Sequence, residues 1–317
     1  MNNNKKCLVV GFGSAGARHT RNAESLGYEV ALVTSQKVKK HKCYFDIAKA
    51  IAMEKPKFAV IASPTYKHVK ELRQCILHNV PALVEKPLAI NHSEFRNKIG
   101  TDSIKTGNYR VGYCLRYHPM ILDLKRRISS LGPLYNANIV FGQYLPIWRP
   151  WRDYRKSYSA SFKKGGGVLL DSSHEIDLIT YLFGPVKKLV AVSKKVSSLK
   201  IDSDDICLLI CQMRSGGFVQ VTLDYLNRIP ERRIVINAKK GSVHLDLIRG
   251  KWCSQVGSAV KNIPYSVERN KLFLQELDDF INRPKRCLLP DLKESEVTLR
   301  IIEAVRKSAQ KGKWIEL

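Results

Sequence analysis

The first third of the chain alternates short apolar runs with longer stretches whose apolar residues recur at helical spacing. The short runs predict buried strands at Cys7–Val10, Tyr28–Val33, Phe58–Ala62, Ala82–Val84 and Arg110–Cys114. Between them, Ser14–Leu26 predicts a helix that Gly27 ends, and Asp46 predicts the cap of another helix. Such alternation is typical of βαβ units with right-handed crossovers. We therefore expect an α/β domain with a doubly wound parallel sheet over residues 1–118.

The pattern changes after Pro119, where longer alternating runs replace the short apolar ones. Predicted strands occupy Leu134–Gln143, Val186–Val196, Ile206–Met213, Phe218–Tyr225, Arg232–Ala238 and Ser242–Leu247. Gly216-Gly217 and Lys240-Gly241 predict tight hairpin turns between strands. Predicted helices occupy Met120–Leu131, Ser172–Phe183, Glu268–Asn282 and Glu294–Lys311. We therefore expect residues 119–317 to form an α+β domain with a large, mostly antiparallel sheet. A second domain is also expected from length, because 317 residues exceed the size of most single cores.

A glycine motif, Gly11-Phe12-Gly13-Ser14-Ala15-Gly16, follows the first predicted strand and begins the first predicted helix. In this motif the first glycine allows a tight turn, the second lets a pyrophosphate approach the backbone, and the third lets helix and strand pack closely. The helix N-terminus offers unpaired amide groups and a positive dipole to the phosphates. The motif therefore predicts a dinucleotide-binding Rossmann domain; the alternative is a glycine turn that binds no ligand.

The end of the second strand bears on the choice of dinucleotide. NAD enzymes usually place Asp or Glu here, where it bonds the ribose 2′-hydroxyl. This chain has hydroxyl and ammonium groups instead, at Thr34, Ser35, Lys37, Lys39 and Lys40. These groups suit a 2′-phosphate, so NADP is slightly favoured over NAD; the alternative is that the lysines form a solvated loop.

Two further segments carry candidate catalytic residues. Lys86 follows the strand Ala82–Val84, at the end of a parallel strand where ligands bind. Farther along, the run Gly165-Gly166-Gly167 precedes Asp171 and His174, which share a face if one helix carries both. A carboxylate that orients an imidazole is a pairing used in general acid–base catalysis. The alternatives are a solvated lysine and a structural His–Asp pair.

The segment Tyr144–Tyr158 is rich in aromatic and arginine side chains, including Trp148, Arg149, Arg152 and Tyr158. Such side chains can stack on a sugar or a base and can pair with phosphate or carboxylate. The alternatives are an ordinary packed loop and a surface for single-stranded nucleic acid.

Composition narrows the choice of partner. Lys and Arg number 54 against 28 Asp and Glu, a net charge of +26, but they are spread along the chain rather than gathered in a basic tail. The eight cysteines include no CxxC pair, which indicates neither a metal site nor a disulfide framework. No apolar run is long enough to span a membrane, and the start of the chain, residues 1–6, predicts the approach to the first strand rather than a signal peptide. We expect a cytoplasmic protein with small ligands and no specific nucleic-acid or membrane partner.

Taken together, these motifs resemble the glucose–fructose oxidoreductase / inositol dehydrogenase / rhizopine catabolism (Gfo/Idh/MocA) family. The matching landmarks are Gly11–Gly16, Ser63-Pro64-Thr65 with His68, Glu85-Lys86-Pro87, Arg116-Tyr117-His118-Pro119, the block Gly165–Asp177, and Leu223-Asp224-Tyr225. They run nearly from end to end of the chain. The segment Tyr144–Ala160 resembles a subgroup associated with bacterial surface-sugar biosynthesis.

The resemblance implies roles for named residues. Lys86 and His174 would line the active site with Asp171 beside them, although Asp171 lies three residues before His174 where many members have four. Cofactor-binding candidates are the glycine motif, Thr34, Ser35, Ser63, Pro64, Thr65, His68, Glu85 and Lys86. Substrate-binding candidates are Arg116, Tyr117, His118, Trp148, Arg149, Arg152 and Tyr158. The family usually assembles through its C-terminal sheets, so a homodimer or homotetramer is expected.

The function implied is hydride transfer between NAD or NADP and a secondary alcohol or ketone of a sugar, nucleotide sugar or cyclitol. Lys86 and His174 would meet at a cleft between the domains, with His174 as the favoured acid–base group. Two other classes remain open: a dinucleotide-binding sensor or scaffold without turnover, and a nucleic-acid-binding protein. A sensor is expected to lack Lys86 or His174, and both are present.

Overall fold

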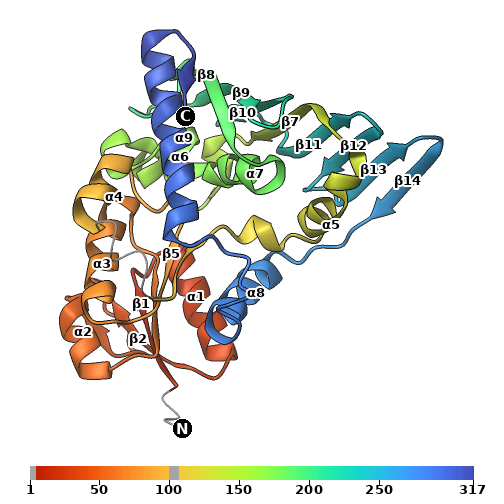
Figure 1. Ribbon diagram of the computed structural model, residues 1–317. Helices are drawn as coiled ribbons and strands as arrows, with labels where there is room; N and C mark the ends of the chain where they lie inside the picture. The colour runs from red at the N-terminus through yellow and green to blue at the C-terminus, as the bar shows by residue number, and fades with distance from the viewer. Residues whose placement is uncertain (1–4, 100–106) are drawn as a thin grey trace. The chain divides into compact units, whose positions relative to one another are not determined.

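The computed structural model of the protein describes residues 5–99 and 107–317; the predicted approach to the first strand at residues 1–4 lies outside this range. The chain divides into two compact units (Figure 1). The first consists of Met1–Tyr117 and Arg269–Leu299, and the second of His118–Glu268 and Arg300–Leu317. The segment from Arg269 to Leu299 thus groups with the N-terminal residues rather than with the strands that precede it.

The first unit is built on a six-stranded parallel sheet in the order β3-β2-β1-β4-β5-β6. The strands are β1 (Lys6–Val10), β2 (Glu29–Val33), β3 (Cys43–Tyr44), β4 (Phe58–Ile61), β5 (Ala82–Glu85) and β6 (Tyr109–Gly112). The strand order reverses between β1 and β4, the point at which doubly wound sheets bind ligands. The predicted Rossmann sheet is confirmed.

Helices pack around this sheet because their apolar faces are buried against strands that are themselves buried on both sides. They are α1 (Ser14–Ser25), α2 (Ile47–Glu54), α3 (Thr65–Leu77), α4 (His92–Ile99) and α8 (Arg269–Asn282), with a 3₁₀ turn η1 (Cys114–Tyr117). Asp46 caps α2 by accepting a hydrogen bond from the Lys49 amide at 2.8 Å, as its position predicts. Helix α4 was not anticipated, since only Phe95 and Ile99 of its residues are buried apolar side chains.

The second unit contains a nine-stranded sheet in the order β14-β13-β12-β11-β7-β10-β9-β8-β15. The strands are β7 (Leu134–Gly142), β8 (Val186–Lys194), β9 (Ile206–Met213), β10 (Phe218–Asp224), β11 (Glu231–Ala238), β12 (Gly241–Asp246), β13 (Lys251–Val256), β14 (Ala259–Pro264) and β15 (Ile315–Glu316). Among its strand pairs only β10 with β7 is parallel. The predicted mostly antiparallel sheet is confirmed. Strands β13 and β14 escaped prediction because most of their side chains are polar or exposed.

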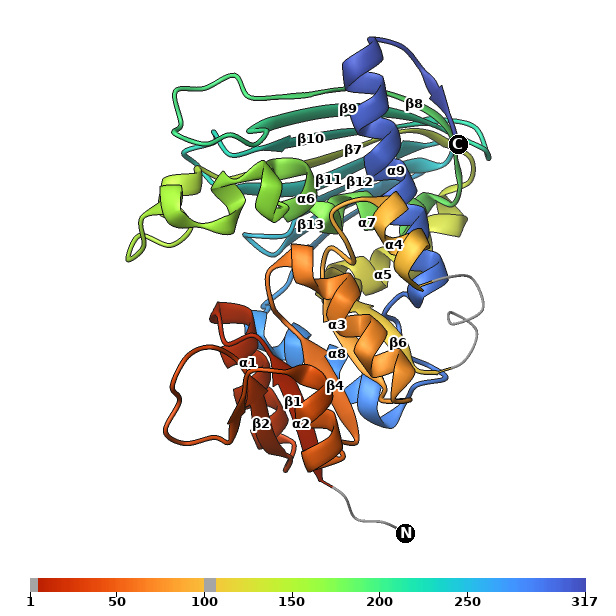
Figure 2. The ribbon, with the colours of Figure 1, turned by 90° about the vertical axis from the view of Figure 1, so that its left-hand side faces the viewer.

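The two faces of this sheet differ. Cys207, Leu209 and Cys211 of β9 point to a buried face, and the Ala191 amide on β8 donates a hydrogen bond to the Ser308 hydroxyl at 2.9 Å. Ser308 belongs to α9 (Leu292–Lys311), which Figure 2 shows beside the sheet together with α6 (Val168–Asp171) and α7 (Ser173–Phe183). On the opposite face, Leu208 and Ile210 are 42% and 41% exposed.

The remaining elements of the second unit are α5 (Pro119–Arg127) and five 3₁₀ turns. These turns are η2 (Ile128–Leu131), η3 (Leu145–Ile147), η4 (Tyr154–Lys156), η5 (Tyr158–Ala160) and η6 (Phe162–Lys164). Within residues 5–99 and 107–317, no helix combines the length and apolar character needed to cross a bilayer.

Candidate active site

The glycine loop of the first unit has the geometry of a phosphate cradle. Gly11 lies at φ +89°, and a Cβ there would come within 2.7 Å of the Ser63 backbone; a Cβ on Gly16 would lie 2.0 Å from the Gly11 carbonyl oxygen. A Cβ on Gly13, by contrast, would meet nothing within 4 Å. Gly13 is the N-cap residue that precedes α1, and it has no side chain that could accept a hydrogen bond from the first amides of the helix. The loop therefore fits the pyrophosphate of a dinucleotide.

The residues after β2 form a turn beside this loop. The side-chain amide of Gln36 donates a hydrogen bond to the Phe12 carbonyl at 3.2 Å, and the backbone N–H of Gln36 donates to the Thr34 hydroxyl at 3.1 Å. Ser35 and Lys37 are exposed, whereas Lys40 pairs with Glu24 of α1 at 2.9 Å. Gln36 is the residue that reaches the glycine loop, and the motif alone did not single it out.

The loop after β4 is held by side chains of α3. Pro64 precedes the first residue of that helix, Thr65, which is buried. The Ser63 hydroxyl donates to the Glu71 carboxylate at 2.5 Å, and burial raises the pKa of Glu71 to about 7. His68 is 1% exposed, and its Nε2 and Nδ1 lie 2.8 Å and 2.9 Å from the carbonyl oxygens of Ser63 and Pro87. Both ring nitrogens of His68 therefore face backbone, and Ser63 is the member of this group that adjoins the glycine loop.

The end of β5 carries Glu85 and Lys86, each partly buried. Glu85 lies 2.8 Å from Nε2 of His19, a buried residue of α1. Burial opposes ionisation of Glu85, but the bond from His19 and the charges of His19 and Lys86 hold its pKa below the ordinary value. Glu85 is therefore the charged carboxylate of this corner. The sequence could have indicated His19 as a site residue, because it lies one helical turn after Gly16 of the glycine motif.

A second carboxyl group, Glu276 of α8, lies near Glu85 and is completely buried. Neither of its oxygens has a hydrogen-bond partner in the described part of the chain. Burial raises the pKa of Glu276 well above its ordinary value, the Glu85 charge adds to this effect, and Arg18 opposes it. Glu276 is thus the protonated member of the carboxyl pair.

Arg116 and Tyr117 make structural contacts in the first unit. Arg116 is 5% exposed and donates to the Leu288 carbonyl at 3.1 Å. The Tyr117 hydroxyl accepts from the Leu288 amide at 3.2 Å and lies 3.6 Å from Sγ of Cys287, and burial raises the Tyr117 pKa far above its ordinary value. These contacts hold the segment that follows α8, and they engage the Tyr117 hydroxyl expected to face substrate.

In the second unit, Asp171 and His174 do not share one helix. Asp171 ends α6 and His174 lies in the first turn of α7, with Ser172 between the helices. The Tyr225 hydroxyl donates to Oδ2 of Asp171 at 2.6 Å, and both residues are buried. Burial and the Asp171 charge raise the pKa of Tyr225 well above its ordinary value, so the phenol remains a donor. Asp171 is therefore an oriented carboxylate, and His174, partly buried, follows it across the break.

The glycine run before α6 makes close contacts with Asp204. Gly167 lies at φ +107°, and a Cβ there would lie 2.1 Å from Oδ1 of Asp204. Oδ2 of Asp204 accepts from the Leu169 amide at 2.9 Å, which places a carboxyl group at the N-terminus of α6. Burial raises the pKa of Asp204, while the Leu169 bond opposes the change. The run lets Asp204 reach the start of the helix that ends at Asp171.

His118 and Glu175 belong to another buried polar group of the second unit. Glu175, 1% exposed, lies 2.8 Å from Nε of Arg232, whose guanidinium stacks 4.4 Å from the Phe141 ring centroid. Burial and the Arg232 charge lower the pKa of His118 to about 4, so its ring is neutral near pH 7 and Nδ1 accepts from the Met120 amide at 3.3 Å. His118 thereby caps α5.

The aromatic segment contains both packed and exposed residues. Trp148 packs edge-on against Phe141 and Tyr225, with centroid distances of 5.9 Å and 5.1 Å, and its indole N–H donates to the Gln143 carbonyl at 3.0 Å. Trp151 is 76% exposed. Trp148 therefore supports Tyr225, and Trp151 is the tryptophan of this segment that offers a stacking surface.

The arginines of this segment differ in exposure as well. Arg152 is exposed and Arg149 is partly buried, while Arg155 pairs with Asp153 through bonds of 2.8 Å. Tyr158 is partly buried at the start of η5.

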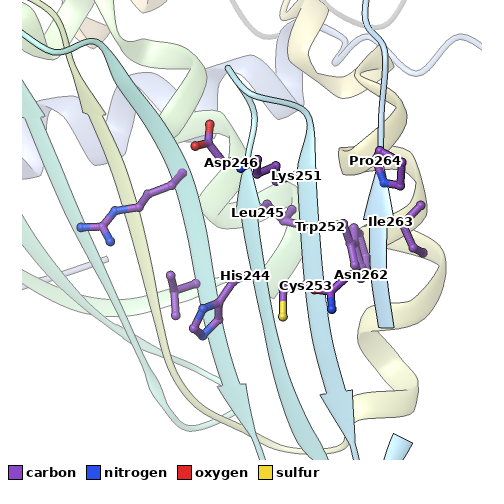
Figure 3. A pocket seen from close by; sticks show the side chains of 11 residues that line it. His244, Leu245, Asp246, Lys251, Trp252, Cys253, Asn262, Ile263 and Pro264 are labelled. Atoms are coloured by element: carbon purple, nitrogen blue, oxygen red, sulfur yellow. The ribbon is translucent and has the colours of Figure 1, made fainter. Parts of the chain in front are cut away.

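A separate hollow of about 410 Å³ lies on the second unit's sheet, over β11 to β14 (Figure 3). Val235, His244, Cys253 and Asn262 are successive partners across these four strands, so they share one face. Of the predicted site residues, none lines this hollow.

Comparison with known families identifies both parts of the chain. Residues 5–101 match the family described as "Oxidoreductase family, NAD-binding Rossmann fold", and residues 125–317 match "Oxidoreductase family, C-terminal alpha/beta domain". The resemblance predicted from the motifs is confirmed.

Individual relatives are distant. Rhizopine catabolism protein MocA of Rhizobium meliloti is 26% identical over 230 residues, 68% of this chain and 69% of the relative. The scyllo-inositol 2-dehydrogenase (NAD(+)) of Bacillus subtilis is 27% identical over 211 residues, 58% of this chain and 55% of that enzyme. The matched region thus spans little more than half of the second relative.

Solved structures share the fold over nearly the full length. A levoglucosan dehydrogenase in complex with NADH has a TM-score of 0.86 at 17% identity, covering 98% of both chains. The WlbA dehydrogenase from Bordetella pertussis, in complex with NADH and UDP-GlcNAcA, has a TM-score of 0.79 at 18% identity, again covering 98% of both chains. With both of its domains matched, the chain belongs to the Gfo/Idh/MocA family of nicotinamide-dependent oxidoreductases.

Proposed function

We propose that this protein transfers a hydride between a nicotinamide cofactor and a secondary alcohol or ketone of a sugar, nucleotide sugar or cyclitol. The observation that carries the proposal is the open backbone at Gly13, at the uncapped start of α1 and at the point where the strand order of the Rossmann sheet reverses. The nicotinamide, when bound, supplies the hydride chemistry. The protein supplies orientation and the accompanying proton transfer.

The residues divide these tasks. His174 is the proposed acid–base group, and Lys86 stabilises negative charge on the reacting oxygen or shares its proton. Asp171 precedes His174 across the break at Ser172, its Oδ2 accepts a hydrogen bond from the Tyr225 hydroxyl, and it is the proposed carboxylate beside the acid–base group. The roles of these residues are supported by their chemistry and by the family to which the chain belongs.

A nucleotide sugar is the preferred substrate class within this proposal. Trp151 and Arg152 are exposed on one segment, where an indole can stack on a base and a guanidinium can pair with pyrophosphate. Among the similar structures, the WlbA dehydrogenase carries UDP-GlcNAcA and a levoglucosan dehydrogenase carries levoglucosan.

A substrate panel tests the function directly. Nucleotide sugars, free sugars, anhydrosugars and cyclitols are incubated with NAD⁺ and NADP⁺ while the nicotinamide absorbance is followed. The corresponding keto derivatives are incubated with the reduced cofactors and followed in the same way. We expect turnover with one of these classes. Tight cofactor binding without turnover on any secondary alcohol or ketone would favour the sensor alternative.

We further propose a preference for NADP(H). Thr34, Ser35 and Gln36 occupy the turn after β2, Lys37 is exposed beside them, and the turn has no acidic residue to repel a 2′-phosphate. Dissociation constants for NADH and NADPH, measured by fluorescence, decide the point. Tighter binding of NADH would exclude the preference, and a Lys37→Glu variant that left the ratio unchanged would remove Lys37 from it.

The open face of the second unit's sheet is the proposed contact with a second copy of the chain. Val192, Leu208, Ile210 and Phe218 are each 41–46% exposed, and the strand register places Val192 opposite Leu208. Burial of such a patch in a dimer removes apolar surface from water. Light scattering after gel filtration should give two or four times the mass of one chain, and Ile210→Lys should lower that mass; a monomeric wild-type protein would exclude the proposal.

A further inference from the structure

The ring of His68 bridges two loops of the first unit. Its Nε2 lies 2.8 Å from the Ser63 carbonyl oxygen and its Nδ1 lies 2.9 Å from the Pro87 carbonyl oxygen. The residue is 1% exposed and lies in the first turn of α3. Because both ring nitrogens face backbone, the side chain spans the two loops rather than presenting a group to a ligand.

The two loops carry the cofactor contact and the catalytic candidate. Ser63 follows β4 and lies against Gly11, since a Cβ on that glycine would come within 2.7 Å of its backbone. Pro87 directly follows Lys86 at the end of β5, which pairs with β4 in parallel register. A rigid connection between the two carbonyls therefore fixes the backbone on which Lys86 is carried relative to the glycine loop.

The number of hydrogen bonds that the His68 ring can donate to the two loops depends on its protonation state. Both of its partners are carbonyl oxygens, which only accept, whereas a neutral imidazole has one N–H and an imidazolium has two. A neutral ring can therefore bond one loop at a time, and a doubly protonated ring bonds both. The alternative for a neutral ring is a contact between two lone pairs at 2.8–2.9 Å, which is unfavourable.

The charges around His68 act in both directions. Burial lowers its pKa, and the positive charge of Lys86 adds to that effect. The two carbonyls and the carboxylate of Glu85 oppose it. The net direction is downward, so the second proton is bound mainly on the acid side of the ordinary histidine range.

We propose that His68 is a positioning residue that connects the loop of Lys86 to the loop of Ser63 beside the glycine motif. Both hydrogen bonds of this connection form together only when the ring carries two protons. The catalytic consequence rests on the function proposed above, but the bridge itself does not. A displacement of about 1 Å at a reacting group can lower a rate by roughly a hundredfold, so a link of this kind affects turnover without touching substrate.

A matched pair of substitutions on α3 tests the coupling. His68→Gln cannot span both carbonyls, so the connection between the two loops is lost, whereas His78→Gln changes an exposed histidine that directly follows the last residue of the same helix. Hydrogen exchange of the segments 63–67 and 85–90 reports on both loops without any substrate. At pH 5, where more of the wild-type rings carry two protons than at pH 8, we expect about tenfold loss of protection in both segments of H68Q, roughly 10–100-fold lower kcat, and wild-type values for H78Q.

Loss of protection in only one segment, or unchanged exchange in a folded H68Q protein, would overturn the coupling. A kcat that stays normal while both segments exchange faster would overturn the positioning of Lys86 and leave the proposed hydride transfer intact. A protein without turnover on any substrate would contradict the proposed function, yet the exchange result would still decide the bridge.

The proton requirement is tested in a variant that keeps His68, so that failure of H68Q to fold would not prevent the test. Glu71 accepts a hydrogen bond from the Ser63 hydroxyl, and burial raises its pKa to about 7, so its own titration could also change exchange between pH 5 and pH 8. Glu71→Gln removes this titration by replacing the carboxyl group with a neutral amide. In E71Q, protection of segments 63–67 and 85–90, corrected for intrinsic exchange rates, should rise severalfold between pH 8 and pH 5. Protection independent of pH would overturn the proton requirement.

Discussion

The candidate site residues of the two units are held in place in different ways. In the first unit, the cofactor loop is shaped by backbone: Gly11 and Gly16 allow approaches that a Cβ would block, and Gly13 leaves its outer side open. In the second unit, side chains from distant parts of the chain hold the segment of Asp171, because Tyr225 donates to Asp171 itself and Asp204 accepts from the Leu169 amide at the start of its helix. Substitutions in the first region are therefore expected to act through steric clashes and backbone geometry. Those in the second region are expected to act through lost hydrogen bonds and altered charge.

The largest expected effect separates two glycines of one motif. Gly16→Val places side-chain atoms where the Gly11 carbonyl lies, with a Cβ at 2.0 Å, so the first unit should lose several kcal/mol of stability. Gly13→Val meets no protein atom within 4 Å of its Cβ, so the fold should survive while the dissociation constant for NAD(P)H rises at least about a hundredfold. Thermal unfolding and fluorescence titration measure the two effects. Normal cofactor affinity in a folded G13V protein would remove the glycine loop from cofactor binding.

The next effect concerns charge in the first unit. Burial raises the folded-state pKa of Glu71 to about 7 from an ordinary 4.5, so the folded protein binds this proton more tightly than the unfolded chain. The contribution to stability is therefore present at low pH and is lost as pH rises from about 4.5 to 7, by at most about 3 kcal/mol. Urea midpoints at pH 5 and pH 8 should converge in E71Q relative to wild type. Equal pH dependence in the two proteins would show that Glu71 is not the responsible group.

A smaller effect is expected at the hydrogen bond that orients Asp171. Tyr225→Phe removes the donor to Oδ2 and leaves the ring packed against Trp148. We expect kcat to fall by about tenfold, the equivalent of roughly 1.4 kcal/mol for a hydrogen bond to a charged group, while cofactor affinity stays within a factor of about two. The matched control is Tyr135→Phe, since Tyr135 is 57% exposed on β7. A wild-type kcat in Y225F would separate this bond from catalysis.

The sequence predicted those features that local patterns encode. The glycine motif, the parallel strands and the position of Lys86 at a strand end follow from residues close together in the chain. The second unit's sheet was predicted in outline, but polar strands such as β13 carry little apolar alternation and were missed. The break at Ser172 was also missed, because three-residue spacing fits a single helix as well as two.

Contacts between distant residues could not be predicted in the same way. Tyr225 and Asp171 are 54 positions apart, and the bridge from His68 to Pro87 spans 19 positions and a helix. Trp148 illustrates the limit most clearly, because neither its packing against Tyr225 nor the bond from its N–H to the Gln143 carbonyl follows from the aromatic, arginine-rich pattern of the loop. Trp151, three residues later, is 76% exposed, a difference within one segment that the sequence pattern does not encode.

Lys86 and His174 are proposed to carry out the proton chemistry of hydride transfer, and one measurement tests their role most directly. With the substrate found in the panel, kcat and the NAD(P)H dissociation constant are determined for wild type, Lys86→Ala and His174→Ala. Loss of a positioned acid–base group should lower kcat by about 10²–10⁴-fold in each variant, with cofactor affinity nearly unchanged. Full turnover in either variant on the true substrate would contradict the account.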